Sequence, residues 1–134
     1  MLLQPKSSKH KKIKKGKLSK YSFKSKKLKF GNVGLKAMSS GIITARQIES
    51  ARQAINRKIN RKGKLWIRIY PNLPITSKPS ESRMGKGKGS VSHWAIKVKA
   101  GQFIFEMCGV TKNSAITAFK SGKSKLPFKT GIFY

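Results

Sequence analysis

The sequence predicts an α+β fold, a two-layer α/β sandwich with an extended basic N-terminal arm. Three observations lead to this prediction. Short segments of extended character follow one another at hairpin rather than crossover spacing. Two further segments carry the apolar periodicity and the end signals of helices. The first thirty residues contain twelve lysines between positions 6 and 29 and no acid, so they cannot bury enough apolar surface to fold alone.

We therefore divide the chain of 134 residues into a basic extension over residues 1–29 and a globular domain over residues 30–134. Hydrophobic residues make up 37% of the chain, which is too much for a purely disordered protein and predicts a modest core. A flexible solubilising tail is the alternative interpretation of the extension. Because the rest of the chain is also basic, we favour an arm that threads along RNA or DNA.

Residues 30–38 open the globular domain and predict a strand interrupted by glycines. Thr44 and Gln47 then form a capping-box signature, because the Thr hydroxyl can accept from the backbone amide three residues on while the Gln side chain reaches back. The helix that follows should run to about Asn60, with Gly63 just past its end. Its expected core face consists of Ala45, Ile48, Ala51, Ile55 and Ile59.

The opposite face of this helix is basic and carries Arg46, Arg57 and Arg61. Glu49 is the only acid on the helix, whereas an ordinary solvated face mixes charges of both signs. We therefore favour phosphate contact over simple solvation for these arginines. Arg52 lies inside the apolar arc, where its stem can be buried and its head must reach solvent or find a partner.

Residues 64–70 form the clearest predicted strand, because apolar and amphipathic side chains alternate along it. The expected core face carries Leu65, Ile67 and Ile69, and the other face carries Trp66, Arg68 and Tyr70. Pro71, Pro74 and Pro79 should then keep the chain out of regular strand pairing.

The segment over residues 81–90 contains three alternating glycines and two lysines, which cannot form a stable strand or helix. Glycine lets backbone amides approach a phosphate ribbon closely, and Lys86 and Lys88 are spaced to flank it. Arg83 adds a planar fork suited to phosphate or guanine. A mobile surface loop is the alternative. The glycine spacing matches neither the P-loop nor the dinucleotide-binding pattern.

Two extended runs follow, over residues 94–99 and 102–107. They meet at Ala100 and Gly101, so they predict a hairpin. At the end of the sequence, residues 129–134 predict a closing edge strand.

A second helix is predicted between these strands. It should begin at Ser114, with Asn113 as its cap, and end near Lys125 before a proline. Gly122 lies inside this helix and should weaken it by about 1 kcal/mol relative to alanine.

The charge balance limits the classes of function. The chain has 32 Lys and Arg against 3 acids, a formal net charge of +29. Such a body repels itself and is neutralised most readily by a polyanion, so nucleic acid is the default partner and an anionic membrane surface the second. The acids are Glu49, Glu81 and Glu106, too few for paired-carboxylate hydrolysis or an oxygen-ligand metal cage. The single Cys108 excludes an intramolecular disulfide and a thiolate zinc site.

We therefore expect no enzyme, no metal site and no cofactor. His93 has no acid near it in sequence, His10 belongs to the lysine-rich extension, and Cys108 is expected to be a small buried hydrophobe. Glu106 can pair with any of many lysines, which contributes little if the pair is exposed. No apolar run approaches the roughly 20 residues that span a bilayer. The start lacks the apolar region of a secretory signal.

Several specific motifs occur in the order typical of one family. They include Thr44-Ala-Arg-Gln-Ile-Glu-Ser-Ala-Arg52, Gly63-Lys-Leu-Trp-Ile-Arg-Ile-Tyr-Pro71, Arg83-Met-Gly-Lys-Gly-Lys-Gly89 and Phe105-Glu-Met-Cys-Gly-Val110. With them the chain resembles, almost from end to end, the bacterial-type large-subunit ribosomal protein sixteen family. It departs from the family where members usually carry arginines in the opening segment and this chain has Lys9, Lys11, Lys12, Lys14 and Lys15. Residues 19–29 match poorly.

The resemblance implies a two-layer α+β domain with an rRNA-bound extension, near the elbow of the A-site tRNA. It implies that the glycine-rich basic loop reaches toward the peptidyl-transferase centre, where RNA performs the chemistry. The expected function is that of a structural constituent of the large ribosomal subunit, which binds large-subunit rRNA and helps position A-site tRNA during translation. Expected partners are that rRNA, A-site tRNA and neighbouring large-subunit ribosomal proteins, with no membrane and no small-molecule substrate.

Two sets of residues are the expected binding sites. The rRNA-binding set is Lys6, Lys9, Lys11, Lys12, Lys14, Lys15, Lys17, Arg46, Arg52, Arg57, Arg61, Lys64 and Arg68. The loop set, near tRNA and the peptidyl-transferase centre, is Arg83, Met84, Gly85, Lys86, Gly87, Lys88 and Gly89.

The bias toward lysine, isoleucine, serine and asparagine suggests an AT-rich genome. With a family-like N-terminus and no transit sequence, the chain resembles an organelle-encoded copy, so we predict the mitochondrial ribosome in the matrix. The bacterial cytoplasm and the plastid are the alternatives. Two rival functions stay open: a cationic membrane-active protein that would use the helix from Thr44, and a nuclease or RNA-modifying enzyme, for which the three acids are too scattered.

Overall fold

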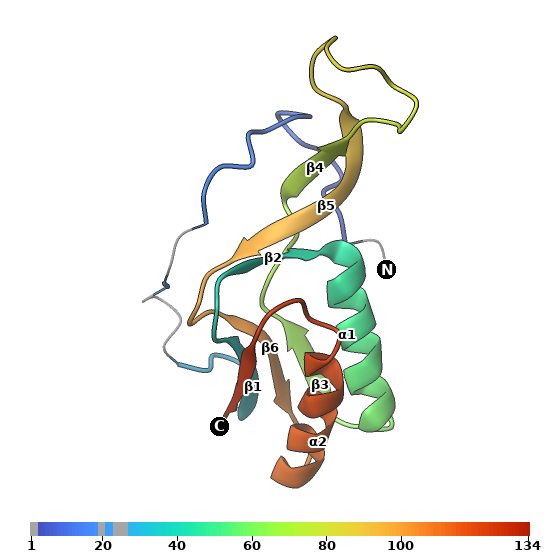
Figure 1. The fold of residues 1–134 in the computed structure, drawn as a ribbon. Helices are drawn as coiled ribbons and strands as arrows, with labels where there is room; N and C mark the ends of the chain where they lie inside the picture. Colours follow the sequence, from blue (N-terminus) through green and yellow to red (C-terminus); the bar gives the residue numbers. More distant parts are fainter. Residues whose placement is uncertain (1–2, 19–20, 23–26) are drawn as a thin grey trace.

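The structure is a computed structural model that describes residues 3–18, 21–22 and 27–134. Its elements in chain order are β1 (Val33–Ala37), β2 (Gly41–Thr44), α1 (Ala45–Lys58), β3 (Lys64–Ile67), β4 (Leu73–Ser77), β5 (Ser90–Val98), β6 (Phe103–Cys108), α2 (Lys112–Lys123) and β7 (Thr130–Phe133). All the strand pairs are antiparallel, and the two helices lie side by side on one side of the domain (Figure 1). The predicted α+β class is confirmed.

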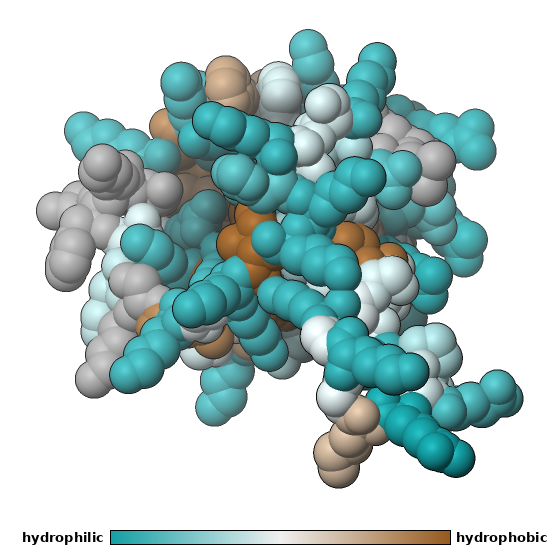
Figure 2. All heavy atoms as spheres, turned by 90° about the horizontal axis from the view of Figure 1, so that it is seen from above, coloured by the Kyte–Doolittle hydropathy of each residue, from teal (hydrophilic) through white to brown (hydrophobic). Residues whose placement is uncertain are grey.

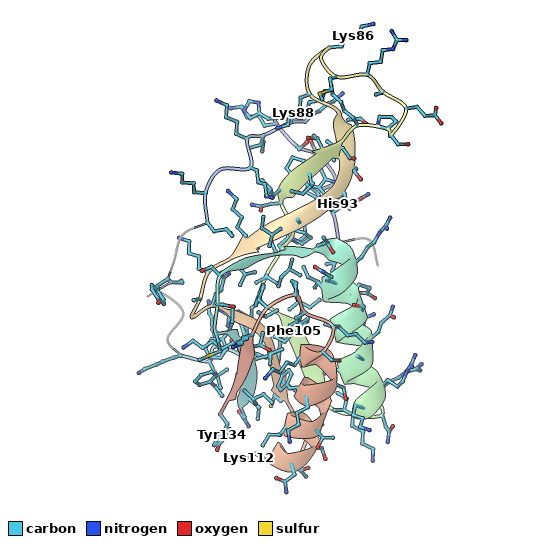
Figure 3. All side chains as sticks on the ribbon, viewed as in Figure 1. Lys86, Lys88, His93, Phe105, Lys112 and Tyr134 are labelled. Carbon is cyan, nitrogen blue, oxygen red and sulfur yellow. The ribbon has the colours of Figure 1, made fainter. Side chains whose placement is uncertain are left out.

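The strands form two sheets. A four-stranded sheet has the order β3-β6-β1-β7, and a three-stranded sheet has the order β2-β5-β4. The core lies between the helices and the four-stranded sheet, where Leu35, Phe105, Ile55 and Phe119 are all fully buried. Figure 3 shows Phe105 in this position, between the sheet and the helix pair.

The predicted hairpin between residues 94–99 and 102–107 is wrong. The tight turn is present at Gly101, whose φ is +88°, but β5 pairs with β2 and β4 whereas β6 pairs with β1 and β3. The reason lies in the bonds around the turn. The Gly101 N–H donates to the Ala37 carbonyl at 2.8 Å, and the Ala37 N–H donates to the Gln102 carbonyl at 2.9 Å. The chain is therefore drawn onto β1 instead of back onto β5.

The expectation that prolines prevent pairing is wrong for β4. Pro74 lies inside this strand, opposite Trp94 of β5. Because β4 is at an edge of the three-stranded sheet, it can place a proline where no backbone N–H is required. Pro71 is buried between β3 and β4, and Pro79 follows β4.

The other predicted strands are present with different ends. β1 begins at Val33 rather than at residue 30, and β3 ends at Ile67 rather than at residue 70. Leu65 and Ile67 pack against the core, and Ile69 is buried beyond the strand, as expected for that face. β7 pairs with β1 at the edge of the four-stranded sheet, which confirms the closing edge strand.

Helix α1 begins as predicted. Thr44 Oγ1 accepts from the Gln47 N–H at 3.3 Å, and Gln47 Oε1 accepts from the Thr44 N–H at 3.0 Å. The helix ends at Lys58, two residues earlier than expected. Asn60 and Arg61 then adopt left-handed conformations, with φ of 51° and 59°, so the chain turns before it reaches the expected glycine.

Helix α2 begins two residues before its predicted start, and Thr111 rather than Asn113 is the N-cap. Gly122 lies inside it, at the contact with α1. A Cβ atom on Gly122 would be 2.6 Å from Cγ1 of the fully buried Ile55. Glycine therefore allows the two helices to pack closely, which propensity alone does not reveal.

Candidate nucleic-acid interface

The face of the molecule drawn in Figure 2 is mostly hydrophilic. Seen from above, polar and charged side chains cover the face, and apolar side chains show only in small areas between them (Figure 2). Among the residues that the structure describes, no helix is long and apolar enough to cross a bilayer. A membrane-active role would need the apolar face of α1 to be accessible, but Ile48, Ala51 and Ile55 of that face are fully buried in the core.

The glycine-rich loop between β4 and β5 projects away from the rest of the domain, and Lys86 lies near its tip (Figure 3). Residues 83–89 form no helix or strand, as predicted. Gly85, Lys86 and Gly87 have positive φ of 90°, 54° and 81°. The Met84 side chain is 99% exposed. The loop thus presents cations and one apolar side chain on a glycine-rich backbone.

The N-terminal arm contacts this loop at its base. Lys12 Nζ donates to the Lys88 carbonyl at 2.7 Å, and Lys88 Nζ donates to the Ile13 carbonyl at 2.6 Å. Lys97 of β5 approaches the Lys17 carbonyl at 3.5 Å. Two segments that the sequence treats as separate sites therefore lie side by side.

The seven arm lysines of the predicted set share one property. Each is exposed to solvent: Lys6, Lys9, Lys11, Lys12, Lys14, Lys15 and Lys17. Lys20, Lys24 and Lys26 of the same lysine-rich extension lie outside the described residues.

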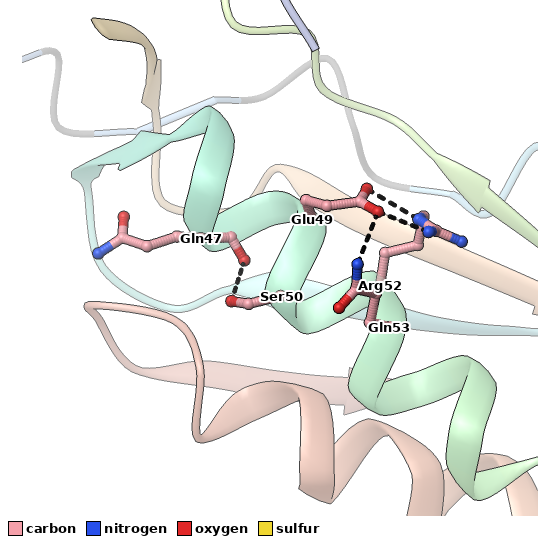
Figure 4. A network of polar contacts seen from close by, with 5 residues as sticks. All are labelled: Gln47, Glu49, Ser50, Arg52 and Gln53. Carbon is pink, nitrogen blue, oxygen red and sulfur yellow. Dashed lines mark hydrogen bonds and ion pairs between the residues drawn. The ribbon is translucent and has the colours of Figure 1, made fainter. Parts of the chain in front are cut away.

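The predicted arginines of α1 differ in their surroundings. Arg46, Arg57 and Arg61 are exposed. Arg52 has a partner, which is one of the two alternatives expected for its head: its Nε and Nη2 donate to the Glu49 carboxylate at 2.9 and 2.6 Å (Figure 4). The hydrogen bond from Arg52 lowers the pKa of Glu49, and the same bond raises the pKa of Arg52. Arg52 is therefore less available to an RNA phosphate than the other three.

Glu106 is buried, at 0% exposed, and its ion-pair partner is an arginine rather than one of the many lysines considered from the sequence. Its Oε2 accepts hydrogen bonds from three successive backbone N–H groups, those of Lys29, Phe30 and Gly31, at 3.1, 2.7 and 3.2 Å. Its Oε1 forms an ion pair with Arg68. These partners compensate for the cost of burying a charged carboxylate. The sequence contains one signal that we missed, an acid within the apolar strand 103–108.

Arg68 thus has a structural partner, although it belongs to the predicted rRNA-binding set. Its guanidinium also lies 4.9 Å from the Phe30 ring centroid, and Phe30 stacks on Trp66 with ring centroids 6.0 Å apart. Lys64, another predicted RNA contact, lies 5.4 Å from the Trp66 ring. These contacts hold residues 29–31, the root of the arm where it joins the globular domain, against the four-stranded sheet.

The groups considered for chemistry do not assemble. Within the described residues, no three His, Cys, Asp or Glu side chains are grouped as a metal site would need. His93 Nδ1 lies 3.3 Å from Ser92 Oγ. Cys108 is partly exposed at the end of β6, so the expectation that it is buried is wrong.

The fold and the charge define a class, a small α+β protein with an almost unopposed cationic surface of the kind that binds a polyanion. The family model described as Ribosomal protein L16p/L10e matches residues 5–133. The large ribosomal subunit protein uL16 of Sphingopyxis alaskensis is 51% identical over 131 residues, which cover 98% of this chain and 92% of the relative. The proteins of the same name from Halorhodospira halophila and Borreliella afzelii are 49% and 50% identical, and each match covers 96% of this chain and 94% of the relative.

The chain therefore belongs to the ribosomal protein L16p/L10e family. This confirms the predicted family, and it identifies the chain as a structural ribosomal protein rather than an enzyme. The three relatives are bacterial. They support the bacterial alternative and do not support the mitochondrial prediction.

Proposed function

We propose that this protein is a constituent of the large ribosomal subunit that binds large-subunit rRNA and helps position A-site tRNA near the peptidyl-transferase centre. The observation that carries the proposal is the contact between the basic arm and the basic loop at Lys12 and Lys88. In a member of this ribosomal family, the contact joins a segment suited to rRNA with one that projects from the body.

The mechanism of rRNA binding is electrostatic. Each lysine or arginine that replaces a condensed counterion on a phosphate should contribute about −0.7 to −0.9 to the slope of log K against log salt concentration. Because the arm carries lysines rather than arginines, it offers point charges without a fork that reads bases. The arm should therefore fix the register of the protein on rRNA and carry little sequence specificity.

The loop is the part proposed to act on tRNA. Its glycines let the backbone approach a phosphate chain closely. Lys86 lies near the tip and makes no hydrogen bond within the described residues, whereas Lys88 bonds to the arm. Replacing Lys86 therefore tests tRNA contact without breaking a hydrogen bond to the arm.

The test is the rate of A-site tRNA accommodation on ribosomes assembled with the Lys86→Ala variant. We expect normal assembly and slower accommodation. Lys120→Ala is the matched control, because Lys120 is an exposed lysine on α2, outside both predicted sites. Assembled Lys86→Ala ribosomes that accommodate tRNA at the wild-type rate would contradict the proposed role of the loop.

The proposal also concerns the cellular compartment of the ribosome to which this protein belongs. Composition and resemblance favour an organelle-encoded copy in the mitochondrial matrix, whereas the bacterial relatives favour the bacterial cytoplasm. The plastid is the third alternative. Sedimentation of the tagged protein from cell fractions, followed by sequencing of the rRNA that co-purifies, distinguishes them because each compartment has its own rRNA sequence.

A further inference from the structure

A groove of about 1000 Å³ lies beside the C-terminal half of α1 and reaches β3. Its lining includes two exposed arginines, Arg57 and Arg61, and three side-chain amides, Gln53, Asn56 and Asn60. Leu65 and Ile67 of β3, both half-buried, supply its apolar part. The volume falls at the upper end of the range of roughly 300–1,000 Å³ for small-ligand pockets.

The groove is strongly cationic. No acid is among the described residues that line it. The nearest acid in sequence, Glu49, is already bonded to Arg52 and Gln53. Neither Arg57 nor Arg61 forms an ion pair within the described chain. Their charges remain available to an anion.

The groove lining also offers side-chain amides and an apolar surface in addition to positive charge. A side-chain amide has both donors and an acceptor, which match the edge of a nucleobase. An apolar surface beside such amides suits the flat face of a base. A continuous RNA duplex cannot use either feature, because its bases are stacked and paired and it is recognised mainly through phosphates and 2′-hydroxyls.

We infer that this groove holds an unpaired nucleotide of rRNA. The base lies against Leu65 and Ile67, the amide of Asn56 bonds to its edge, and Arg57 and Arg61 contact the flanking phosphates. This inference rests on the proposed rRNA binding and deepens it, since it names bulged or single-stranded RNA as the ligand at this place.

The test compares the affinity of the full chain for two RNA probes at one salt concentration. One probe is a plain duplex, and the other is the same duplex with a single bulged nucleotide, made with each of the four bases in turn. We expect about tenfold tighter binding to at least one bulged probe. Asn56→Ala should abolish this preference and leave the affinity for the plain duplex unchanged.

Arg57→Gln provides the contrast for phosphate contact. It should weaken binding to both probes by a similar factor and make the salt slope shallower by about 1. Lys120 is an exposed lysine of α2 outside the groove, so Lys120→Gln should leave the preference for the bulged probe unchanged. Asn56→Leu, which keeps a similar side-chain size and has no hydrogen-bonding group, repeats the amide test if Asn56→Ala does not fold.

The two hypotheses fail differently. Absence of salt-dependent binding to either probe would overturn the proposed rRNA binding. Equal affinity of the wild-type chain for plain and bulged probes, with all four bases, would overturn the groove inference and leave rRNA binding intact. A preference that survives both amide substitutions would also overturn it.

Discussion

Glu106 shows how one buried charge can organise a basic protein. A buried carboxylate is tolerated only when it is paired and hydrogen-bonded. Here it has one guanidinium and three backbone N–H donors, and those donors belong to the root of the arm. The strand residue and the arm therefore depend on each other.

Replacing Glu106 by Gln should reduce the free energy of unfolding by about 3–5 kcal/mol, because the partner Arg68 loses its counter-charge in a largely buried setting. Urea denaturation measures the change. Glu81→Gln removes an exposed acid and should change stability by less than about 0.5 kcal/mol. A Glu106→Gln protein as stable as the Glu81→Gln control would show that the network does not hold the fold.

Glu49 leads to a prediction about pH. The hydrogen bond from Arg52 holds the pKa of Glu49 below its ordinary value of 4.5. The unfolded chain therefore binds this proton at higher pH than the folded chain does, so the stability that the pair contributes is present above 4.5 and is lost as the pH falls through the lowered pKa.

Glu49→Gln should thus cost less than about 1 kcal/mol at neutral pH, because the pair is partly exposed and screened by solvent. The difference from wild type should shrink toward zero as the pH falls below 4.5. Urea denaturation across that pH range tests this. A stability difference that is the same at all pH values would mean that the carboxylate charge is not its cause.

The partners of single residues can be predicted from the sequence only where those partners lie close by along the chain. The partner of Arg52 was foreseeable because Glu49 lies one helical turn away. Glu106 was not, because Arg68 is 38 positions away in sequence and the arm amides are 75 to 77 away. A pattern along the chain does not show which distant groups surround a strand residue.

At the scale of elements, Gly122 sets helix propensity against packing. Alanine is favoured over glycine in a helix interior by about 1 kcal/mol, but the Cβ atom would overlap Ile55 at 2.6 Å. Ile55 is fully buried and cannot move freely. We expect the overlap to dominate, since overpacking a core costs about 1–3 kcal/mol.

Gly122→Ala should therefore be destabilising on thermal denaturation, although propensity alone predicts the reverse. The same substitution in an Ile55→Ala background should cost less, because the atoms that Cβ would meet have been removed. Ser121→Ala, one residue earlier in α2, is the matched control for propensity. An increase in stability for Gly122→Ala in the wild-type background would show that the helices can separate without cost.

The elements were predicted better than their pairing. Both helices and most strands occur near their predicted positions, since capping residues and apolar periodicity are local signals. The predicted turn at Gly101 is also present. The predicted pairing of the two strands that it joins is wrong, because hydrogen bonds to Ala37, more than sixty residues earlier, direct β6 into the other sheet. Pro74 was misjudged for the same reason, since only the sheet order shows that β4 is an edge strand.

At the scale of the whole molecule, the charge balance was the most informative property. It excluded most catalytic and metal chemistry before any fold was known, and it indicated a polyanionic partner. The charge balance did not predict the contact between the arm and the loop, because lysines repel one another and no charge pattern brings them together. Backbone carbonyls, which accept from Lys12 and Lys88, make that contact possible.

The last prediction concerns the arm as a whole. Replace by Gln the seven exposed lysines Lys6, Lys9, Lys11, Lys12, Lys14, Lys15 and Lys17. The domain should stay folded, because none of these side chains is buried. If each contacts a phosphate, the slope of log K against log salt concentration for rRNA binding should become shallower by up to about 5 to 6. Binding titrations at several salt concentrations measure this slope.

The matched control replaces lysines in and after α2, which belong to neither predicted site: Lys112, Lys120, Lys123, Lys125 and Lys129. Both variants lower the overall charge, so both weaken the general attraction to RNA. Only phosphates in direct contact should change the slope strongly, and the loss per lysine should therefore be larger for the arm. Equal losses per lysine in the two variants would show that rRNA responds to the charge of the protein as a whole and that the arm has no separate binding role.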